Sequence, residues 1–352
     1  MPSKVSQHAS DTANPLHQAD LNRLRQVLNH GPVLILTHHN PDPDALAAGA
    51  GLAYLLEYKW GLEVHKKYSG LVARAENIAM LKHLTPGWSR KTALSDSSSY
   101  GSVVLVDTQP GAGNNILPSN MLPEAVFDHH QPIRRQASSE SYLDLRPEIG
   151  AAATLIYQHL EVANLAIPPR LATALFYGIK TDTRGLSRGA SAGDKVAYIN
   201  LLGNVDHDAL LQVEQARRPV SFFRSLTEGL AAARVYGSTV VAMLGEMYRP
   251  DFAAELADQL IMLEGARGAL CAGCHEGILQ LSVRTVPLGE DAGLLIQRVV
   301  DNLGRGGGHG VMAGGQIRLE GQDLEAIEAS LVSRFLTLMG DDNTTGHNLI
   351  NN

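Results

Sequence analysis

The residues with the clearest chemical potential lie at positions 37–44, which read THHNPDPD and follow the apolar run at 33–36. Four apolar residues followed by a turn-rich segment predict a short buried strand that runs into a loop. The loop carries the imidazole of His38 and the carboxylates of Asp42 and Asp44. Two carboxylates so close in sequence repel each other unless a cation neutralises them, and a neutral imidazole adds a ligand suited to Mn, Fe or Zn. The segment therefore predicts a metal site. In isolation, capping of the helix expected from residue 45 is the alternative role for both carboxylates.

Three further apolar segments end at acidic or histidine-containing clusters. The run at 103–106 ends at Asp107, the run at 125–127 ends at Asp128, His129 and His130, and the segment at 171–179 precedes Asp182. Taken alone, Asp107 could be a turn residue, and the two histidines could be a hydrogen-bonded structural pair. The carboxyl ends of strands in a parallel sheet meet at one edge, where open α/β sheets bind ligands. Four independent coincidences are a poor explanation, so we expect these side chains to converge on one site.

The elements that must position these residues alternate along the first half of the chain. Strands are predicted at 33–36, 64–68, 103–106 and 125–127, and helices at 20–28, 45–58, 75–84 and 171–179. This alternation favours an α/β fold with a parallel sheet and helices on both faces. Strands at 238–244, 278–286 and 316–319, with helices at 251–263, 292–303 and 324–338, predict a smaller α+β domain.

These patterns divide the chain into five parts. We expect a disordered N-terminal tail at 1–18, the α/β domain at 19–190, a helical connector at 191–222, the α+β domain at 223–340 and a frayed C-terminal tail at 341–352.

Composition narrows the classes of partner. Hydrophobic residues make up 44% of the 352 residues, which excludes a largely disordered protein. Residues 1–204 carry 18 Lys and Arg against 17 Asp and Glu, whereas residues 205–352 carry 11 against 19. A long duplex usually needs an electropositive track, so we expect any nucleic-acid ligand to be short. The sequence shows no signal peptide and no membrane-spanning apolar run, which predicts a cytoplasmic protein without a membrane partner. The sequence is also compatible with a homodimer.

The two cysteines, Cys271 and Cys274, precede His275 in a pattern that matches c-type haem attachment. Haem attachment requires export, and the segment runs into an alternating strand. We therefore favour a structural pair at the edge of a strand over haem, a redox couple or a metal site.

A glycine-rich segment in the second half contains Gly306, Gly307, Gly308 and His309. Bare backbone can approach a ligand closely and point its N–H groups at phosphate or carboxylate, although a flexible turn is equally rich in glycine. Arg284 lies on the polar side of the preceding strand and offers a second group that could bind an anion.

Together these motifs resemble the DHH phosphoesterase superfamily. The resemblance rests on the segment from His38 to Asp44, on Asp107, on the Asp128-His129-His130 triplet and on Asp182, in that order. The glycine-rich segment at 306–309, with the glycine at 314, resembles the signature of the companion DHHA1 domain. Within the superfamily the chain most resembles the two-domain branch that contains nano-RNase and pAp phosphatase enzymes.

The resemblance implies roles for individual residues. It implies two divalent cations, most often Mn²⁺, with Mg²⁺ or Co²⁺ as alternatives. The implied metal ligands, with Asp107 as the bridge, are His38, Asp42, Asp44, Asp107, His129 and Asp182. His130 would contact the phosphoryl group or protonate the leaving oxygen, and Asp128 would orient an imidazole. The second domain would hold the substrate through Arg284 and a loop formed by Gly306, Gly307, Gly308 and His309.

The leading hypothesis is a Mn²⁺-dependent phosphoesterase that hydrolyses short oligonucleotides to mononucleotides and also removes the 3′-phosphate of pAp. The alternatives are a cyclic or linear dinucleotide phosphodiesterase, a RecJ-like single-strand exonuclease, and a metal protein that senses a nucleotide without hydrolysing it. Inorganic pyrophosphatase is disfavoured because the glycine-rich second domain is of the nucleotide-enzyme type.

Overall fold

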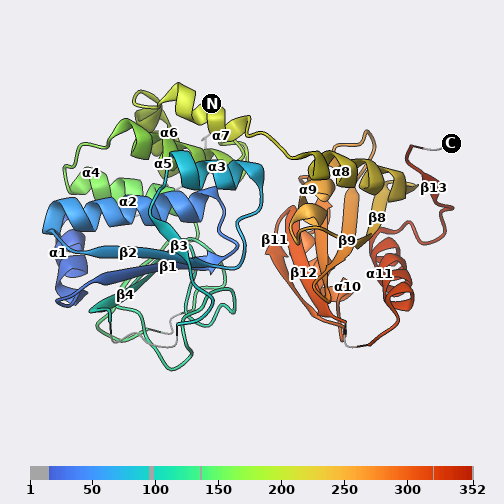
Figure 1. The fold of residues 1–352 in the computed structure, drawn as a ribbon, viewed down its shortest axis with the longest axis horizontal. Helices are drawn as coiled ribbons and strands as arrows, with labels where there is room; N and C mark the ends of the chain where they lie inside the picture. The colour runs from blue at the N-terminus through green and yellow to red at the C-terminus, as the bar shows by residue number, and fades with distance from the viewer. Residues whose placement is uncertain (1–15, 95–98, 135–136, 320, 351–352) are drawn as a thin grey trace, which may run out of the picture. The chain divides into compact units, whose positions relative to one another are not determined.

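The structure is a computed structural model that describes residues 16–94, 99–134, 137–319 and 321–350, without the side chain of His309. The chain forms two compact units, residues 1–216 and residues 217–352. Each unit has its own sheet and its own hydrophobic core (Figure 1).

The sheet of the first unit contains six parallel strands in the order β3-β2-β1-β4-β5-β6. The strands are β1 (Val33–His39), β2 (Val64–Ser69), β3 (Trp88–Arg90), β4 (Ser102–Val106), β5 (Ala125–Asp128) and β6 (Tyr142–Leu145). From β1 the chain adds β2 and β3 toward one edge of the sheet, and from β4 it adds β5 and β6 toward the other edge. The carboxyl ends of β1 and β4 therefore flank a switch point, where the chain leaves a crevice for ligands. The predicted α/β class with a parallel sheet is confirmed.

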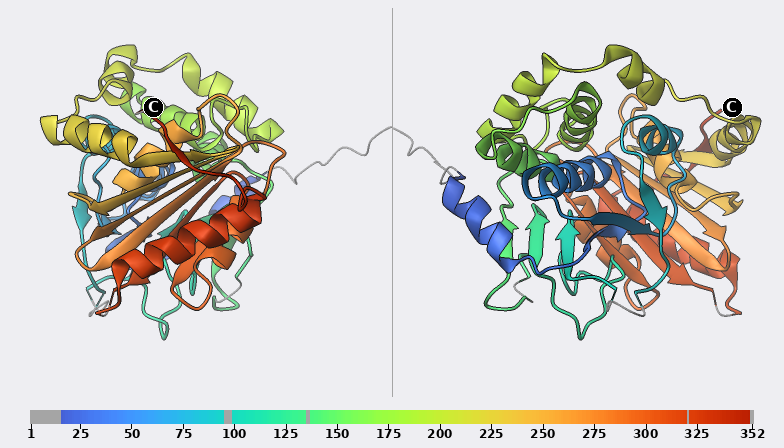
Figure 2. Two further views of the ribbon diagram at one scale, coloured as in Figure 1. Left: turned by 90° about the vertical axis from the view of Figure 1, so that its right-hand side faces the viewer. Right: turned by 60° about the vertical axis from the view of Figure 1, so that its left-hand side comes forward.

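All described helices of this unit contribute to a core on one face of the sheet (Figures 1 and 2). They are α1 (Gln18–Val27), α2 (Pro43–Trp60), α3 (Ala75–His83), α4 (Ala152–Val162), α5 (Pro169–Asp182), α6 (Ala192–Leu202) and α7 (His207–Glu214). The opposite face is covered by side chains from connecting segments, including Leu94, Ile116 and Met121. The expectation of helices on both faces was therefore wrong. The segment between β4 and β5 contains Gly111 and Gly113 at positive φ, which favours turns over a crossover helix.

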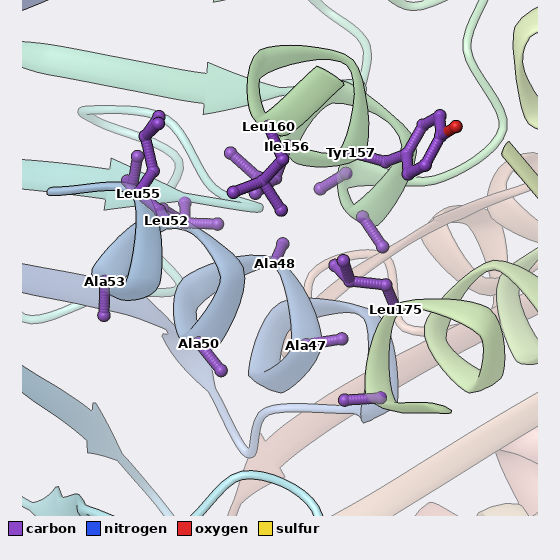
Figure 3. Packing of buried hydrophobic residues seen from close by; sticks show 14 of the residues in the cluster. Ala47, Ala48, Ala50, Leu52, Ala53, Leu55, Ile156, Tyr157, Leu160 and Leu175 are labelled. Atoms are coloured by element: carbon purple, nitrogen blue, oxygen red, sulfur yellow. The ribbon is translucent and has the colours of Figure 1, made fainter. Parts of the chain in front are cut away.

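Small residues on α2 let helices α4 and α5 pack closely against it. Helix α2 thereby links the core to the segment of Asp42 and Asp44 at its amino end. Figure 3 shows Ala47 and Ala48 of α2 facing Leu175 of α5 and Ile156 of α4. A Cβ atom on Gly178 of α5 would lie only 3.1 Å from the Cα atom of Asp44. This close packing fixes the carboxyl end of α5 beside the amino end of α2.

The second unit has a seven-stranded mixed sheet in the order β11-β12-β10-β9-β8-β7-β13. The strands are β7 (Ala233–Tyr236), β8 (Thr239–Glu246), β9 (Gly268–His275), β10 (Ile278–Thr285), β11 (Arg305–His309), β12 (Met312–Arg318) and β13 (His347–Asn348). Strands β8 and β9 pair in parallel and the other described pairs are antiparallel. Helices α8 (Val220–Ala232) and α9 (Phe252–Leu260) pack on one face, and α10 (Ala292–Val299) and α11 (Leu324–Met339) pack on the other (Figure 2).

Two details differ from the expectations, and a third expectation falls mostly outside the described residues. Helices α6 and α7, expected in a connector at 191–222, contribute Ala197 and Val213 to the core of the first unit. The segment expected as a frayed tail at 341–352 supplies β13, which pairs with β7, and Asp341 accepts hydrogen bonds from Ser238 and Thr239. Such tertiary contacts leave no local pattern in the sequence. Of the tail expected at 1–18, residues 1–15 lie outside the described residues, and α1 begins at Gln18.

The cysteine pair lies within β9, a central strand of this sheet, and both thiols are free and buried. Burial raises the pKa of both thiols, which makes the reactive thiolate scarce. In the part of the chain that the structure describes, no helix is both long and apolar enough to cross a membrane.

Candidate metal centre

The predicted metal ligands of the first unit come from four element ends. His38 lies near the end of β1, Asp107 follows β4, His129 follows β5, and Asp182 is the last residue of α5. Asp107 adopts φ +58°, a left-handed conformation that aspartate and asparagine tolerate better than most residues. These ends meet at the carboxyl edge of the sheet, as the sequence predicted.

The two acids after β1 have different local roles. Asp42 is the N-cap of α2 and accepts a hydrogen bond of 3.0 Å from the backbone N–H of Ala45. Asp44 caps a different helix, because its two oxygens accept hydrogen bonds from the N–H groups of Ala152 (2.6 Å) and Ala153 (2.8 Å) at the start of α4. A carboxylate has about four lone-pair sites, so each acid retains capacity for a further ligand.

The side chains form two clusters that share Asp107. In one cluster His38 Nε2 lies 3.4 Å from Asp107 Oδ2 and 3.8 Å from Asp42 Oδ1. In the other, His129 Nε2 lies 3.3 Å from Asp107 Oδ1, 3.3 Å from Asp182 Oδ2 and 3.9 Å from Asp44 Oδ2. The candidate ligand atoms fall into three groups of three, each within 4.8 Å of one another: His38, Asp42 and Asp107; Asp44, His129 and Asp182; and Asp107, His129 and His130. One carboxylate thus contributes an oxygen to each of the two clusters.

The orientation of the histidines fits a cation. His38 Nδ1 lies 2.8 Å from the carbonyl of His39, and His129 Nδ1 lies 3.1 Å from the carbonyl of Ile149. Because a carbonyl only accepts hydrogen bonds, each Nδ1 carries the proton and each Nε2 can offer a lone pair. Within the described residues, the buried atoms His129 Nε2 and Asp107 Oδ1 have no hydrogen-bond partner. Two buried lone pairs 3.3 Å apart need a positive charge between them.

The electrostatics of the two clusters also require added positive charge. Burial alone would lower the pKa of His38 and of His129, but the nearby Asp107 carboxylate raises both well above the ordinary value. Burial alone would raise the pKa of Asp107, but the two imidazoles hold it well below its usual range. Burial raises the pKa of Asp182, whose place at the carboxyl end of a helix also disfavours negative charge. Without a cation, the site must take up protons instead.

His130 lies beside the two clusters, where it forms a third possible ligand group with Asp107 and His129. Its Nδ1 donates to Asp128 Oδ1 at 2.9 Å, and 42% of its side chain is exposed, against 10% for His129. Asp128 also accepts a hydrogen bond of 2.6 Å from Gln109 Nε2, and Gln109 is itself 3% exposed. Burial opposes protonation of His130, yet the Asp128 carboxylate raises its pKa. Gln109 is a site residue that sequence reasoning missed, and its position two residues after Asp107 was the only available signal.

The predicted substrate-binding residues lie in the second unit. Arg284 is on β10, but its side chain is buried: Nε donates to Asp258 Oδ1 at 2.5 Å and Nη1 donates to Ser282 Oγ at 2.7 Å. Its charge is therefore already balanced by a carboxylate from α9, and its placement differs from that expected of an open anion-binding group.

The expected loop at 306–309 is instead the edge strand β11, so that expectation was wrong. Gly306 packs against α10, where an added Cβ would lie 3.0 Å from Ile296. Gly308 has φ +148° and close contact with Ala313, whereas a Cβ on Gly307 would meet nothing within 4 Å. Gly307 pairs with the bare backbone of Gly314, which leaves open space on that side of the strand. The side chain of His309 lies outside the described part of the structure.

Comparisons with known proteins agree with this fold. Residues 32–179 match the N-terminal domain of the DHH family. An uncharacterized protein of Methanocaldococcus jannaschii is 31% identical over 289 residues, covering 82% of this chain and 58% of that protein. A probable manganese-dependent inorganic pyrophosphatase of Streptococcus agalactiae is 24% identical over 151 residues, covering 43% of this chain and 48% of that protein. Residues 32–179 therefore form a DHH N-terminal domain, and a second domain follows it.

The similarity in structure extends beyond the matched domain. The crystal structure of an exopolyphosphatase-related protein from Bacteroides fragilis aligns with a TM-score of 0.70 over 92% of this chain and 98% of that chain, at 16% identity. At that identity the likeness concerns the fold alone. The chain spans about half the length of the two curated relatives, 58% and 48% respectively.

Proposed function

We propose that this chain is a Mn²⁺-dependent phosphoesterase that hydrolyses short oligonucleotides to mononucleotides and also removes the 3′-phosphate of pAp. The observation that carries the proposal is the pair of ligand clusters joined by Asp107, with unpaired buried atoms facing each other on Asp107 and His129. Hard carboxylates combined with two imidazoles suit Mn²⁺, and Mg²⁺ or Co²⁺ are the alternatives.

The donor set divides between two cations. His38, Asp42 and Asp107 would hold one, and Asp44, Asp107, His129 and Asp182 would hold the other. Two divalent cations supply Lewis-acid activation of water and neutralise charge on the phosphoryl oxygens. The chain's own contribution is to fix the ligands on rigid element ends, which avoids reorganisation during the reaction.

His130 would supply proton transfer. Asp128 holds Nδ1, and Gln109 holds Asp128, so a buried chain of hydrogen bonds fixes the ring while 42% of the side chain stays exposed. The raised pKa of His130 keeps a larger protonated fraction near neutral pH, which suits a group that contacts a phosphoryl oxygen or protonates a leaving alkoxide.

The second unit would bind a part of the substrate that does not react. The open space beside Gly307 gives a flat base or a phosphate direct access to the backbone of β11. The excess of 19 acids over 11 bases in residues 205–352 gives little electrostatic benefit to additional phosphates, so the proposal is restricted to short chains.

Inorganic pyrophosphate is the second candidate substrate, because one relative is a probable manganese-dependent inorganic pyrophosphatase. Its match covers 43% of this chain, so it concerns only part of the protein. Dinucleotide phosphodiesterase, RecJ-like exonuclease and non-catalytic nucleotide sensor are the remaining alternatives.

A substrate panel with Mn²⁺ tests the proposal. We expect kcat/KM to be highest for oligonucleotides of about two to five nucleotides and much lower for a 24-mer and for pyrophosphate. A 24-mer hydrolysed as efficiently as a 3-mer would favour a RecJ-like exonuclease. Preferred hydrolysis of pyrophosphate would favour a pyrophosphatase, and tight nucleotide binding without turnover would favour a sensor.

The variants Gly307→Ala and Gly307→Val test the second unit separately. A Cβ atom at this position meets nothing within 4 Å, so we expect folding to be preserved. We expect KM for a trinucleotide to rise with side-chain size, while kcat/KM for bis-p-nitrophenyl phosphate stays unchanged. Equal losses on both substrates would contradict a role of β11 in substrate binding.

A further inference from the structure

A buried carboxylate outside the predicted site holds the backbone that orients two of the candidate metal ligands. Asp194 on α6 is fully buried and lies beyond the residues matched by the family model. Its Oδ2 accepts hydrogen bonds from the N–H of Gly150 (2.7 Å), and its Oδ1 accepts one from Thr154 Oγ1 (2.6 Å). Ser191 donates to Oδ2 through its N–H (2.7 Å) and its hydroxyl (2.5 Å).

Capping of α6 does not account for this arrangement. The reciprocal bonds between Ser191 and Asp194 form a capping box, which satisfies the start of α6 and can be formed by an exposed residue. The bonds to Gly150 and Thr154 reach 44 and 40 residues back along the chain. Burying a carboxylate is costly unless it is fully hydrogen-bonded, and here all of its bonds converge on one backbone segment and one helix start.

The segment held by Asp194, residues 149–154, contacts the metal centre at three points. The carbonyl of Ile149 accepts from His129 Nδ1 at 3.1 Å, which directs Nε2 toward Asp107. The N–H groups of Ala152 and Ala153 bind both oxygens of Asp44.

The third contact is steric. A Cβ on Gly150 would lie 2.8 Å from Thr183 Cγ2 and 3.0 Å from Asp194 Oδ2, so the bare backbone of Gly150 packs directly beside the residue that follows Asp182. Segment 149–154 therefore lies against the supports of His129, Asp44 and Asp182, which form a single ligand group.

We propose that Asp194 is a positioning residue of the metal centre: it locks segment 149–154 and thereby sets the orientation of His129 and Asp44 for one of the two cations. This inference rests on the proposed metal-dependent function. Residues that orient ligands in this way typically change metal affinity by 10- to 100-fold when they are replaced.

The test measures Mn²⁺ affinity by titration calorimetry and Mn²⁺ electron paramagnetic resonance, without any substrate. In Asp194→Asn the amide offers one acceptor oxygen and places an N–H₂ group against N–H or O–H donors. We expect the Kd of one Mn²⁺, the one assigned to Asp44, His129 and Asp182, to rise by about 10- to 100-fold. Thr154→Val removes one of the four bonds with little change of shape, and we expect a smaller increase of roughly several-fold.

Asp206→Ala is the matched control. Asp206 caps α7 in the same unit by accepting from the N–H of Ala209, and its removal costs helix stability without touching segment 149–154. Affinity is measured at a temperature where each metal-free variant is folded by circular dichroism. A general loss of stability does not alter the Kd of molecules that are already folded, so we expect the control to stay within about twofold of wild type.

Each outcome has a distinct meaning. If wild type binds two Mn²⁺ and a folded Asp194→Asn binds both with unchanged Kd, the positioning role is overturned. If Asp194→Asn does not fold, Thr154→Val decides, and an unchanged Kd in that variant overturns the role. If wild type itself binds no Mn²⁺, the proposed function fails, and the inference about Asp194 fails with it.

Discussion

Asp107→Asn is the substitution that separates a shared bridging ligand from an ordinary one. Asparagine tolerates the left-handed backbone at this position, where φ is +58°, and the backbone N–H still donates to the carbonyl of Phe127. Asp107 contributes Oδ1 to the cluster of His129 and Oδ2 to the cluster of His38. An amide has one oxygen, so only one cluster can keep a ligand from this side chain.

The expected size of the effect follows from the lost charge. Two unit charges about 4 Å apart interact by on the order of 4 kcal/mol at an effective dielectric constant near 20, and a divalent cation doubles this to about 8 kcal/mol. Even half of that loss corresponds to roughly a 1000-fold weaker Kd for the cation that retains the amide oxygen, so we expect at least this change. The other cluster would have an N–H₂ group facing its cation, so we expect stoichiometry to fall from two Mn²⁺ to one or none. Hydrolysis should be abolished.

Calorimetry, metal analysis of the dialysed protein and turnover of bis-p-nitrophenyl phosphate measure these quantities. The exposed carboxylate of Asp208 on α7 provides the control, because Asp208→Asn removes the same charge from the same unit. We expect the metal-free variants to remain folded, since loss of Asp107 also relieves its repulsion of Asp44 and Asp182. A folded Asp107→Asn protein that binds two Mn²⁺ with near-normal affinity, or that retains near-normal turnover, would refute the shared-ligand argument.

Three further predictions concern neighbouring features. His130→Ala should lower kcat and leave two Mn²⁺ per chain, because His130 Nδ1 is bound to Asp128 and is not assigned to a cation. Loss of one ion in metal analysis would show instead that His130 is a metal ligand. The rise in Tm on adding Mn²⁺ should grow from about pH 5.5 to about pH 8. Because the pKa values of His38 and His129 are raised in the folded protein, bound protons stabilise the metal-free protein at low pH, and this stabilisation is lost as the pH rises. Mn²⁺ binds only the unprotonated rings, so its own stabilising effect increases over the same range. A Tm rise that shrinks over this range in a scanning calorimeter would contradict the sign. Arg284→Ala should lower the free energy of unfolding of the second unit by about 2 kcal/mol, measured by urea titration. This value includes a discount for the 30% exposure of Asp258. An unchanged free energy of unfolding would contradict a structural ion pair.

The sequence predicted the convergence of the site because that convergence depends on local patterns. Apolar runs that end at Asp107 and at Asp128 define parallel strands, and the ends of such strands share an edge. The fold class followed from the same alternation. The distribution of the helices between the two faces of the sheet could not be predicted in this way. The segment between β4 and β5 forms no helix, and only packing shows which face of the sheet it covers.

The residues that were missed, or whose role was mispredicted, have partners that are distant in sequence. Asp194 has the local appearance of a capping residue, and its bonds to Gly150 and Thr154 exist only in the folded chain. Arg284 lies on the predicted strand, but its partner Asp258 comes from α9. Sequence patterns indicate which side chains can carry charge or bind metal, whereas the partner that engages each charge is a property of tertiary structure.

Anomalous diffraction at the manganese absorption edge, from crystals grown with Mn²⁺, tests the central claim most directly. The proposed centre predicts two peaks in the first unit, about 3.5–4 Å apart, with Asp107 bound to both ions. His38 and Asp42 should complete the first site, and His129 with Asp182 should contact the second. A single peak, or two peaks that do not share Asp107, would contradict the two-metal account.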